Sequence, residues 1–163
     1  GLSLPDLRSE ERVFQLLRQV AGRAGRRKIR GKILIQTFHP DDQIFQHLRK
    51  HEIKEFQDGQ LKHRQESLLP PFASLAKITI SDPDKTKAFK DCKALHEHIK
   101  KSADFSKYIL EAHFAPAFFP RSHNKYHFHI VLKAENKKKS ADFLEQIEVP
   151  TNAKIDMDPV SLL

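Results

Sequence analysis

Cysteine, methionine and long apolar runs are nearly or wholly missing from this chain. Its 163 residues include one cysteine, Cys92, and one methionine, Met157. A single cysteine excludes an internal disulfide and a cysteine-based zinc site within the chain, so a reducing, cytoplasmic setting is expected. The chain also begins without an initiator methionine, which favours a piece of a longer protein.

No apolar stretch approaches the roughly 20 residues that a membrane-spanning helix needs, and the first residues do not resemble a secretory signal. We therefore expect no membrane partner. Hydrophobic residues make up 39% of the chain and charged residues 31%, a balance typical of a globular protein rather than a disordered one. The length suits one domain, or one domain with part of another.

Positive charge is in excess, with 29 Lys and Arg against 21 Asp and Glu and a net charge of +8. The excess is densest within residues 19–32, "QVAGRAGRRKIRGK", where no acidic residue occurs. A polyanion is a plausible partner, because basic contacts to phosphate release condensed counterions. From charge alone, a nucleic acid partner and a surface adapted for solubility remain equally open.

Residues 1–67 have the pattern helix, strand, helix, helix. Apolar residues at 13, 16, 17 and 20 follow helical spacing, and residues 32–38, "KILIQTF", are predicted to form a short buried strand. Two helical stretches follow Pro40. With one clear strand, this part is expected to be the edge of a parallel sheet rather than a complete domain.

Residues 68–163 have the pattern of a complete small domain that begins at the pair Pro70-Pro71. Strands are predicted over residues 75–80, 108–114, 125–134 and 154–158. Between them, one helix carries Phe89, Cys92, Leu95 and Ile99 on one face, and a second carries Ala141, Leu144 and Ile147. The order β-α-β-β-α-β is that of a split βαβ, ferredoxin-like layer. The predicted fold class is therefore α/β, with domains at 1–67 and 68–163.

Candidate chemistry outside the basic segment is sparse. His127 and His129 share one face of a predicted strand, but no third ligand has a recognisable spacing, so no metal site is predicted. Asp156 and Asp158 fit the charged side of an edge strand better than a pair of catalytic carboxylates. Cys92 is predicted to be a core residue. No GxxxxGK[ST] loop is present to cradle a triphosphate.

Two Gly-Arg pairs, Gly22-Arg23 and Gly25-Arg26, stand three residues apart in the basic segment. Glycine allows a backbone to come close to a ligand, and two guanidinium groups on one helical turn suit a triphosphate. The other interpretation is an exposed basic turn without a ligand, and the residues alone favour it.

The string "QVAGRAGR" resembles motif VI (QxxGRxGR) of superfamily 2 helicases. The longer string "LSLPDLRSEERVFQLLRQVAGRAGR", with "GKILIQTFHPDD", "LPPF" and the final "KIDMDPVSLL", is similar in register to the primosomal replication protein N′ (PriA) family. The resemblance covers essentially the whole chain. It implies that residues 1–67 are the C-terminal edge of a RecA-like helicase lobe and that residues 68–163 are the C-terminal domain.

The activity that the resemblance implies is that of an ATP-dependent 3′-to-5′ DNA helicase that restarts replication at stalled forks. ATP and Mg²⁺ would be bound mainly outside this chain, zinc would be bound in the parent protein only, and the chain alone would not hydrolyse ATP. The implied partners are single-stranded and forked DNA, single-stranded-DNA-binding protein and other primosome proteins, in a cytoplasmic, nucleoid-associated setting.

By the same resemblance, Arg26 is the candidate arginine finger, and Arg23 and Gln19 are further catalytic positions that would face ATP. The nucleic-acid-binding candidates are Arg27, Lys28, Arg30, Lys125 and Tyr126. The partner-binding candidates are Lys137, Lys138 and Lys139, for which a solvated charge run is at least as good an interpretation. Before the aromatic strand many relatives carry a Gly-Arg-rich turn, whereas this chain has "SHNKYHF", a departure that weakens the expected DNA contact there.

An alternative function is a stand-alone nucleic-acid-binding module without enzymatic activity, because β-α-β-β-α-β layers often bind RNA on their sheet. Such modules present two or three stacking aromatic residues in a characteristic motif. The chain contains no such string.

Overall fold

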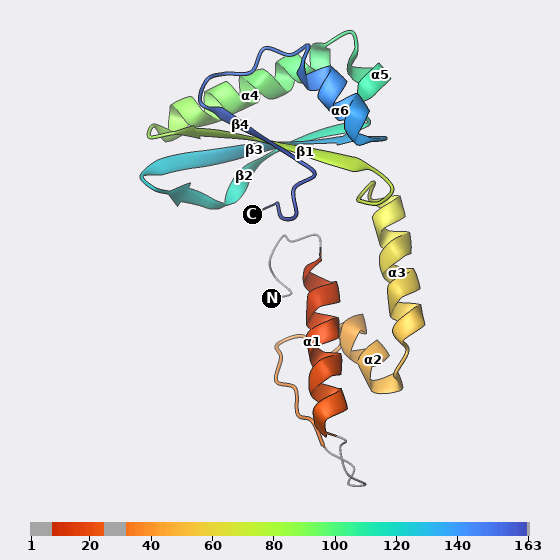
Figure 1. Ribbon diagram of the computed structural model, residues 1–163. Helices are drawn as coiled ribbons and strands as arrows, with labels where there is room; N and C mark the ends of the chain where they lie inside the picture. Colours follow the sequence, from red (N-terminus) through yellow and green to blue (C-terminus); the bar gives the residue numbers. More distant parts are fainter. Residues whose placement is uncertain (1–7, 25–31, 163) are drawn as a thin grey trace. The chain divides into compact units, whose positions relative to one another are not determined.

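The computed structural model describes residues 8–24 and 32–162, which fall into two compact units within residues 1–63 and 64–163. The first, here called the helical unit, contains α1 (Ser9–Ala24), α2 (Gln43–Lys50) and most of α3 (Ile53–Glu66). The second, the sheet unit, contains every strand of the described residues (Figure 1). No helix in the described ranges is long and apolar enough to cross a membrane.

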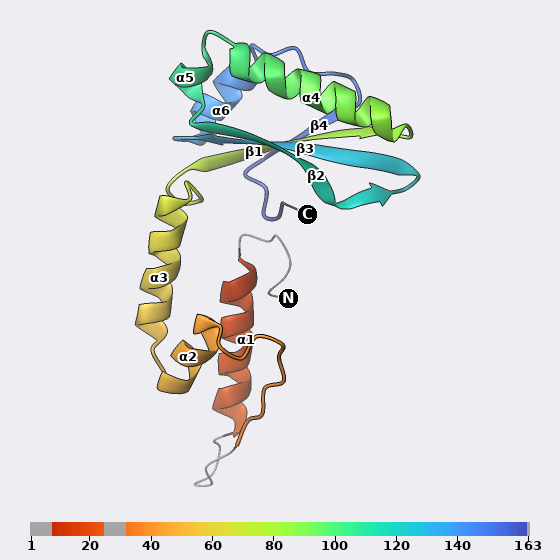
Figure 2. The same ribbon diagram turned by 180° about the vertical axis from the view of Figure 1, so that it is seen from behind.

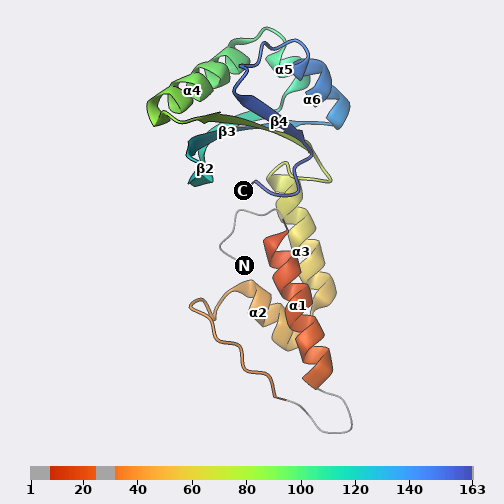
Figure 3. The same cartoon turned by 60° about the vertical axis from the view of Figure 1, so that its left-hand side comes forward.

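The helical unit is held together by a small aromatic cluster. The rings of Phe14 on α1 and Phe56 on α3 stack with centroids 4.0 Å apart, and Ile44 and Phe45 of α2 are buried with them. Near the other end of the contact, the Gln60 side-chain amide donates to the Glu10 carboxylate at 2.7 Å. Because residue 10 meets 60 and residue 14 meets 56, α1 and α3 run antiparallel (Figure 3).

The predicted strand at residues 32–38 is wrong. The segment has no regular secondary structure, and its apolar side chains face solvent, with Leu34 90% and Phe38 100% exposed. A strand needs hydrogen-bond partners from a neighbouring strand, and the described residues of the helical unit provide none. The apolar pattern alone therefore did not determine the local structure.

The sheet unit is a four-stranded antiparallel sheet with helices on one face. The strands β1 (Ser74–Asp82), β2 (Glu111–Ser122), β3 (Lys125–Ala134) and β4 (Ala153–Met157) lie in the order β2-β3-β1-β4. The helices α4 (Lys85–Lys101), α5 (Phe105–Tyr108) and α6 (Lys137–Leu144) cover one face (Figures 1 and 2). The mixed α/β class is confirmed at this level.

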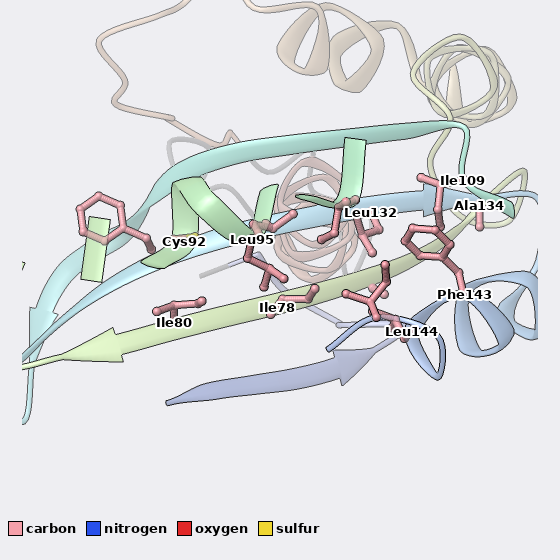
Figure 4. Close-up of a cluster of buried hydrophobic side chains, with 14 of the residues drawn as sticks. Ile78, Ile80, Cys92, Leu95, Ile109, Leu132, Ala134, Phe143 and Leu144 are labelled. Atoms are coloured by element: carbon pink, nitrogen blue, oxygen red, sulfur yellow. The ribbon is translucent and has the colours of Figure 1, made fainter. Parts of the chain in front are cut away.

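The core lies between that face and the helices. Alternate residues of a strand point to the same side, so Ile78 and Ile80 of β1 are directed to the helices, where both are fully buried. On α4, Cys92 and Ile99 are also fully buried. Figure 4 shows Cys92 on the helix that faces the sheet. Cys92 is thus a core residue as predicted, and burial raises the pKa of its thiol to about 12.

The second predicted strand differs from the observed one at both ends. Residues 105–108 form the short helix α5, in which Ile109 N–H donates to the Phe105 carbonyl, so β2 begins only at Glu111. β2 then continues to Ser122, past Pro116 and Pro120. Proline is tolerated here because β2 is an edge strand and because the pairing of β2 with β3 is interrupted between Pro116 and Arg121.

Candidate functional site

The motif residues that the structure describes lie on the last turns of α1. Gln19 and Arg23 are four residues apart, so they share one face of the helix, and both are exposed. A Cβ atom added at Gly22, between them, would meet no atom of the described residues within 4 Å. This end of α1 therefore presents an amide, a guanidinium group and an uncrowded backbone to solvent.

The other basic candidates of the same segment cannot be placed in this way. Arg26, Arg27, Lys28 and Arg30 lie outside the described residues. Their proposed roles remain predictions from the sequence.

The two candidates of the sheet unit, Lys125 and Tyr126, begin β3 directly after the hairpin turn. The turn residues His123 and Asn124 have φ values of 48° and 57°, the left-handed pair that suits a tight two-residue hairpin. Lys125 is exposed, while Tyr126 is half-buried against the core. The structure thus keeps the basic residue, but not the whole aromatic ring, open to a ligand.

Arg121 of β2 pairs with Tyr126 across the hairpin, and its guanidinium carbon lies 5.4 Å from the centre of the tyrosine ring. This cation–π pair was missed by sequence reasoning. The exposed Phe118 and Phe119, which precede Arg121, were missed as well. The residue types were visible in the sequence, but their placement depends on an irregular pairing of β2 that no periodicity indicates.

His127 links three strands on the face of the sheet opposite the helices. Its Nδ1 lies 2.8 Å from Ser81 Oγ on β1, and its Nε2 lies 2.9 Å from Ser122 Oγ on β2. Both ring nitrogens therefore have hydrogen-bond partners. Among the residues that the structure describes, no group of three metal-ligating side chains is found.

His129 is the buried counterpart on the same face, only 7% exposed. Its Nδ1 lies 3.0 Å from Thr79 Oγ1, while its Nε2 has no hydrogen-bond partner within the described part of the chain. Burial, followed by the nearby charges of Lys77 and His127, lowers the pKa of His129 to about 4. The ring is therefore neutral at physiological pH and links β3 to β1.

The three lysines at the start of α6 do not form a uniform cationic surface. Lys137 Nζ lies 3.4 Å from an Asp158 carboxylate oxygen, and Lys139 Nζ lies 2.7 Å from a Glu135 carboxylate oxygen. Lys138 is exposed. An acidic partner would have to compete with the two carboxylates for Lys137 and Lys139.

No family model matches the chain. Curated proteins named Replication restart protein PriA do match it. The protein of Bacillus subtilis (strain 168) is 32% identical over 90% of this chain, and that of Rickettsia felis is 30% identical over 99% of it. The chain belongs to the PriA family. The PriA of Chlamydia trachomatis serovar D is 28% identical, again over 99% of the chain. The aligned part spans only 18%, 25% and 22% of the lengths of these three relatives.

Proposed function

We propose that this chain is part of an ATP-dependent 3′-to-5′ DNA helicase that restarts replication at stalled forks through primosome assembly. In this proposal the helical unit is the end of a RecA-like lobe, and the sheet unit is a split βαβ, ferredoxin-like C-terminal domain. The observation that carries it is the shared, exposed face of Gln19 and Arg23 at the end of α1, within a string that resembles motif VI.

The exposed apolar segment supports the assignment of the helical unit. Ile33, Leu34, Ile35 and Phe38 expose apolar side chains next to one another in the sequence. Apolar surface of this extent is normally covered by a neighbour. Other elements of a RecA-like lobe, whose sheet is covered on both faces, would cover it.

The strand order supports the assignment of the sheet unit. A split βαβ layer places its third strand between the first and second, as β3 lies between β1 and β2 here. Both longer helices, α4 and α6, cover the same face of the sheet, as in a split βαβ layer (Figure 1).

ATP and Mg²⁺ would be held mainly by parts of the helicase beyond this sequence, and zinc would be bound only there. When bound, ATP supplies the phosphoryl group that is transferred to water. Arg26 would stabilise the negative charge that develops on this group, and Arg23 would make a second phosphate contact. Gln19 would add a side-chain amide to the face of α1 that carries Arg23. A guanidinium group suits both positions because it is planar, always charged and donates several hydrogen bonds.

The remaining candidate residues would bind nucleic acid and protein partners. Lys125 and Tyr126 of the sheet unit would contact single-stranded or forked DNA. Arg27, Lys28 and Arg30 are separate candidates for DNA contact. The lysines at 137–139 would meet the acidic tail of single-stranded-DNA-binding protein, although two of them already have carboxylates nearby. The setting would be cytoplasmic and nucleoid-associated.

The test is DNA-stimulated ATP hydrolysis by the full-length protein with Arg26→Ala. The rate should fall by at least about a hundredfold, because supplying an arginine finger is worth on the order of 10³ to 10⁵ in rate. ATP affinity should change much less. Arg26→Lys should not restore the rate, since an ammonium group cannot reproduce the planar fork. The matched control is Arg18→Ala, an exposed arginine on the same helix outside the motif.

A variant Arg26→Ala that kept more than half of the turnover while losing affinity for DNA would assign this arginine to the DNA backbone instead. The isolated chain should release no phosphate from ATP above background, with or without single-stranded DNA. Measurable turnover by the chain alone would contradict the placing of the ATP site mainly outside it.

A further inference from the structure

The end of the β2–β3 hairpin carries aromatic and cationic side chains that the proposed ATPase site does not use. We propose that this hairpin tip, defined as residues 117–126, binds single-stranded DNA by stacking bases on Phe118 and Phe119. The inference rests on the proposed function for the choice of DNA over RNA.

An irregular pairing pushes the two phenylalanines out of the sheet. Pro116 pairs with Phe128 and Arg121 pairs with Tyr126, so residues 117–120 of β2 lie opposite His127 alone. The bulge begins after one proline and ends with another, Pro120, and neither has an N–H group to give to the ladder. In Figure 2 the hairpin end projects from the sheet.

The base of the bulge is fixed in place. His127 Nε2 lies 2.9 Å from Ser122 Oγ and 3.2 Å from the Ser122 carbonyl oxygen, while its Nδ1 lies 2.8 Å from Ser81 Oγ. Ala117, the first residue of the bulge, is buried. The tip is therefore held at both sides of the exposed rings, which limits the conformational entropy that binding would cost.

The aromatic rings are open to solvent. Phe118 is 46% and Phe119 59% exposed, and their ring centroids lie 5.1 Å apart with the planes at 86°. A single exposed apolar side chain is ordinary, but two adjacent rings next to the Arg121–Tyr126 cation–π pair are not. Bases of a single strand stack on such rings regardless of sequence, because every base has a π-face.

The charge around the tip favours a polyanion. The tip itself, residues 117–126, includes Arg121 and Lys125 but no aspartate or glutamate. The acidic residue nearest in the sheet, Asp82 of β1 opposite Tyr126, is already ion-paired with Lys87. Phosphates of a strand whose bases meet the phenylalanines would lie beside these cations. A duplex fits less well, since its bases are already stacked on each other and would have to be taken out of the stack.

The experiment measures binding of the chain to an oligothymidylate that carries one 2-aminopurine, by anisotropy and by quenching of the 2-aminopurine fluorescence. Phe118→Ala with Phe119→Ala should weaken binding about tenfold or more for each base that stacks and should abolish the quenching. The dependence of affinity on salt should stay as in the wild type. Arg121→Ala should instead lower the slope of log K against log salt by about 0.7, as expected for one lost phosphate contact on a single strand.

The matched control is the double variant Phe38→Ala with Phe72→Ala, which removes two exposed phenylalanines outside the tip and should bind DNA as the wild type does. Phe118→Leu with Phe119→Leu keeps apolar side chains of similar size and should bind as weakly as the alanine pair, whereas the two tyrosine replacements should restore binding. The leucine pair also serves if the alanine pair fails to fold.

Wild-type affinity and quenching in both the alanine and leucine pairs would overturn the stacking site while leaving the proposed DNA-binding function in place. Absence of any DNA binding by the wild-type chain at low salt would overturn both. If the alanine pair lost as much affinity for a duplex of the same sequence, the assignment to single strands would be overturned. If the wild-type chain bound the matching RNA more tightly than the DNA, the choice of DNA would be overturned.

Discussion

The two units of this chain bury their apolar residues to very different degrees. In the sheet unit, β1 and β3 place their alternate isoleucines and leucines against α4 and α6, and many of these side chains are fully buried. In the helical unit, the described core is the small cluster of Phe14, Ile44, Phe45 and Phe56. The same unit exposes Leu16, Val20 and the apolar segment 33–38.

This difference shows that regular secondary structure and a self-sufficient core are separate properties. The helices of the helical unit form because their hydrogen bonds are local, with or without a large core. The apolar segment 33–38 cannot form a strand in the same way, because strand hydrogen bonds must come from another strand. We therefore expect the sheet unit to unfold as a stable cooperative body and the helical unit to be much less stable.

The largest expected effect is on the sheet unit, through Phe143→Ala. This side chain on α6 is fully buried, and its ring lies 6.3 Å from those of Phe105 and Tyr108. The substitution should lower the free energy of unfolding of the sheet unit by about 3–5 kcal/mol, since it leaves a cavity that the close-packed core cannot fully fill.

Tyrosine fluorescence during urea unfolding measures this effect in the sheet unit alone, because Tyr108 and Tyr126 are the two tyrosines and the chain has no tryptophan. The matched control is Phe14→Ala in the helical unit, which should reduce helical circular dichroism while leaving the tyrosine transition in place. If Phe14→Ala shifted the tyrosine transition as much as Phe143→Ala does, the two units would unfold together. That result would contradict the expected difference in their stability.

The next effect concerns acid and again separates the units. The pKa of His129 is lowered from 6.5 to about 4 in the folded sheet, mainly by burial. Between these values the unfolded chain binds more protons than the folded one, so stability falls as the pH is lowered from 6.5 to 4 and this contribution is constant below that range. The full loss is about 3 kcal/mol.

Urea unfolding followed by tyrosine fluorescence at a series of pH values measures the loss. His129→Gln should remove this part of the pH dependence, because glutamine does not titrate. The control His47→Gln replaces a histidine of the helical unit and should leave the tyrosine-detected pH dependence as it was. An unchanged acid response in His129→Gln would show that another group is responsible.

The sequence predicted the sheet unit far better than the helical unit, for the same physical reason. Alternation in "LAKITI" and "KYHFHIVLKA" indicates one buried face, and the strands and helices that bury it lie within residues 74–157. "KILIQTF" has the composition of a strand, but its described surroundings contain no strand to pair with. Periodicity predicts which face is apolar, not whether a partner is present.

The placement of the candidate side chains was predictable only where helical spacing determines it. Gln19 and Arg23 share an exposed helix face, as their spacing requires. The hairpin tip was not predictable, because its aromatic pair depends on a bulge whose length is set by the pairing of two strands. The ion pairs of Lys137 and Lys139 were missed because Asp158 is distant in the sequence and Glu135 precedes the helix.

The smallest expected effect concerns the N-cap residues of one helix in each unit. The Asp84 side chain accepts hydrogen bonds from the N–H groups of Thr86 and Lys87, at 2.7 and 3.3 Å, and so caps α4. Asp42 holds the same position before α2 but makes no side-chain cap bond. Asp84→Ala should therefore cost about 1 kcal/mol of sheet-unit stability, since a lost cap leaves helix N–H groups without their partner.

Asp42→Ala is the matched control, because it removes the same carboxylate from the same helix position without removing a cap bond. We expect it to change the helical unit by only a few tenths of a kcal/mol, the small effect of a charge near a helix N-terminus. Asp84→Asn should retain most of the stability, because asparagine caps about as well as aspartate. Tyrosine fluorescence follows the Asp84 variants and circular dichroism at 222 nm follows Asp42→Ala, both in urea. A loss on Asp42→Ala equal to that on Asp84→Ala would mean that charge at the helix terminus, and not the cap bond, stabilises both helices.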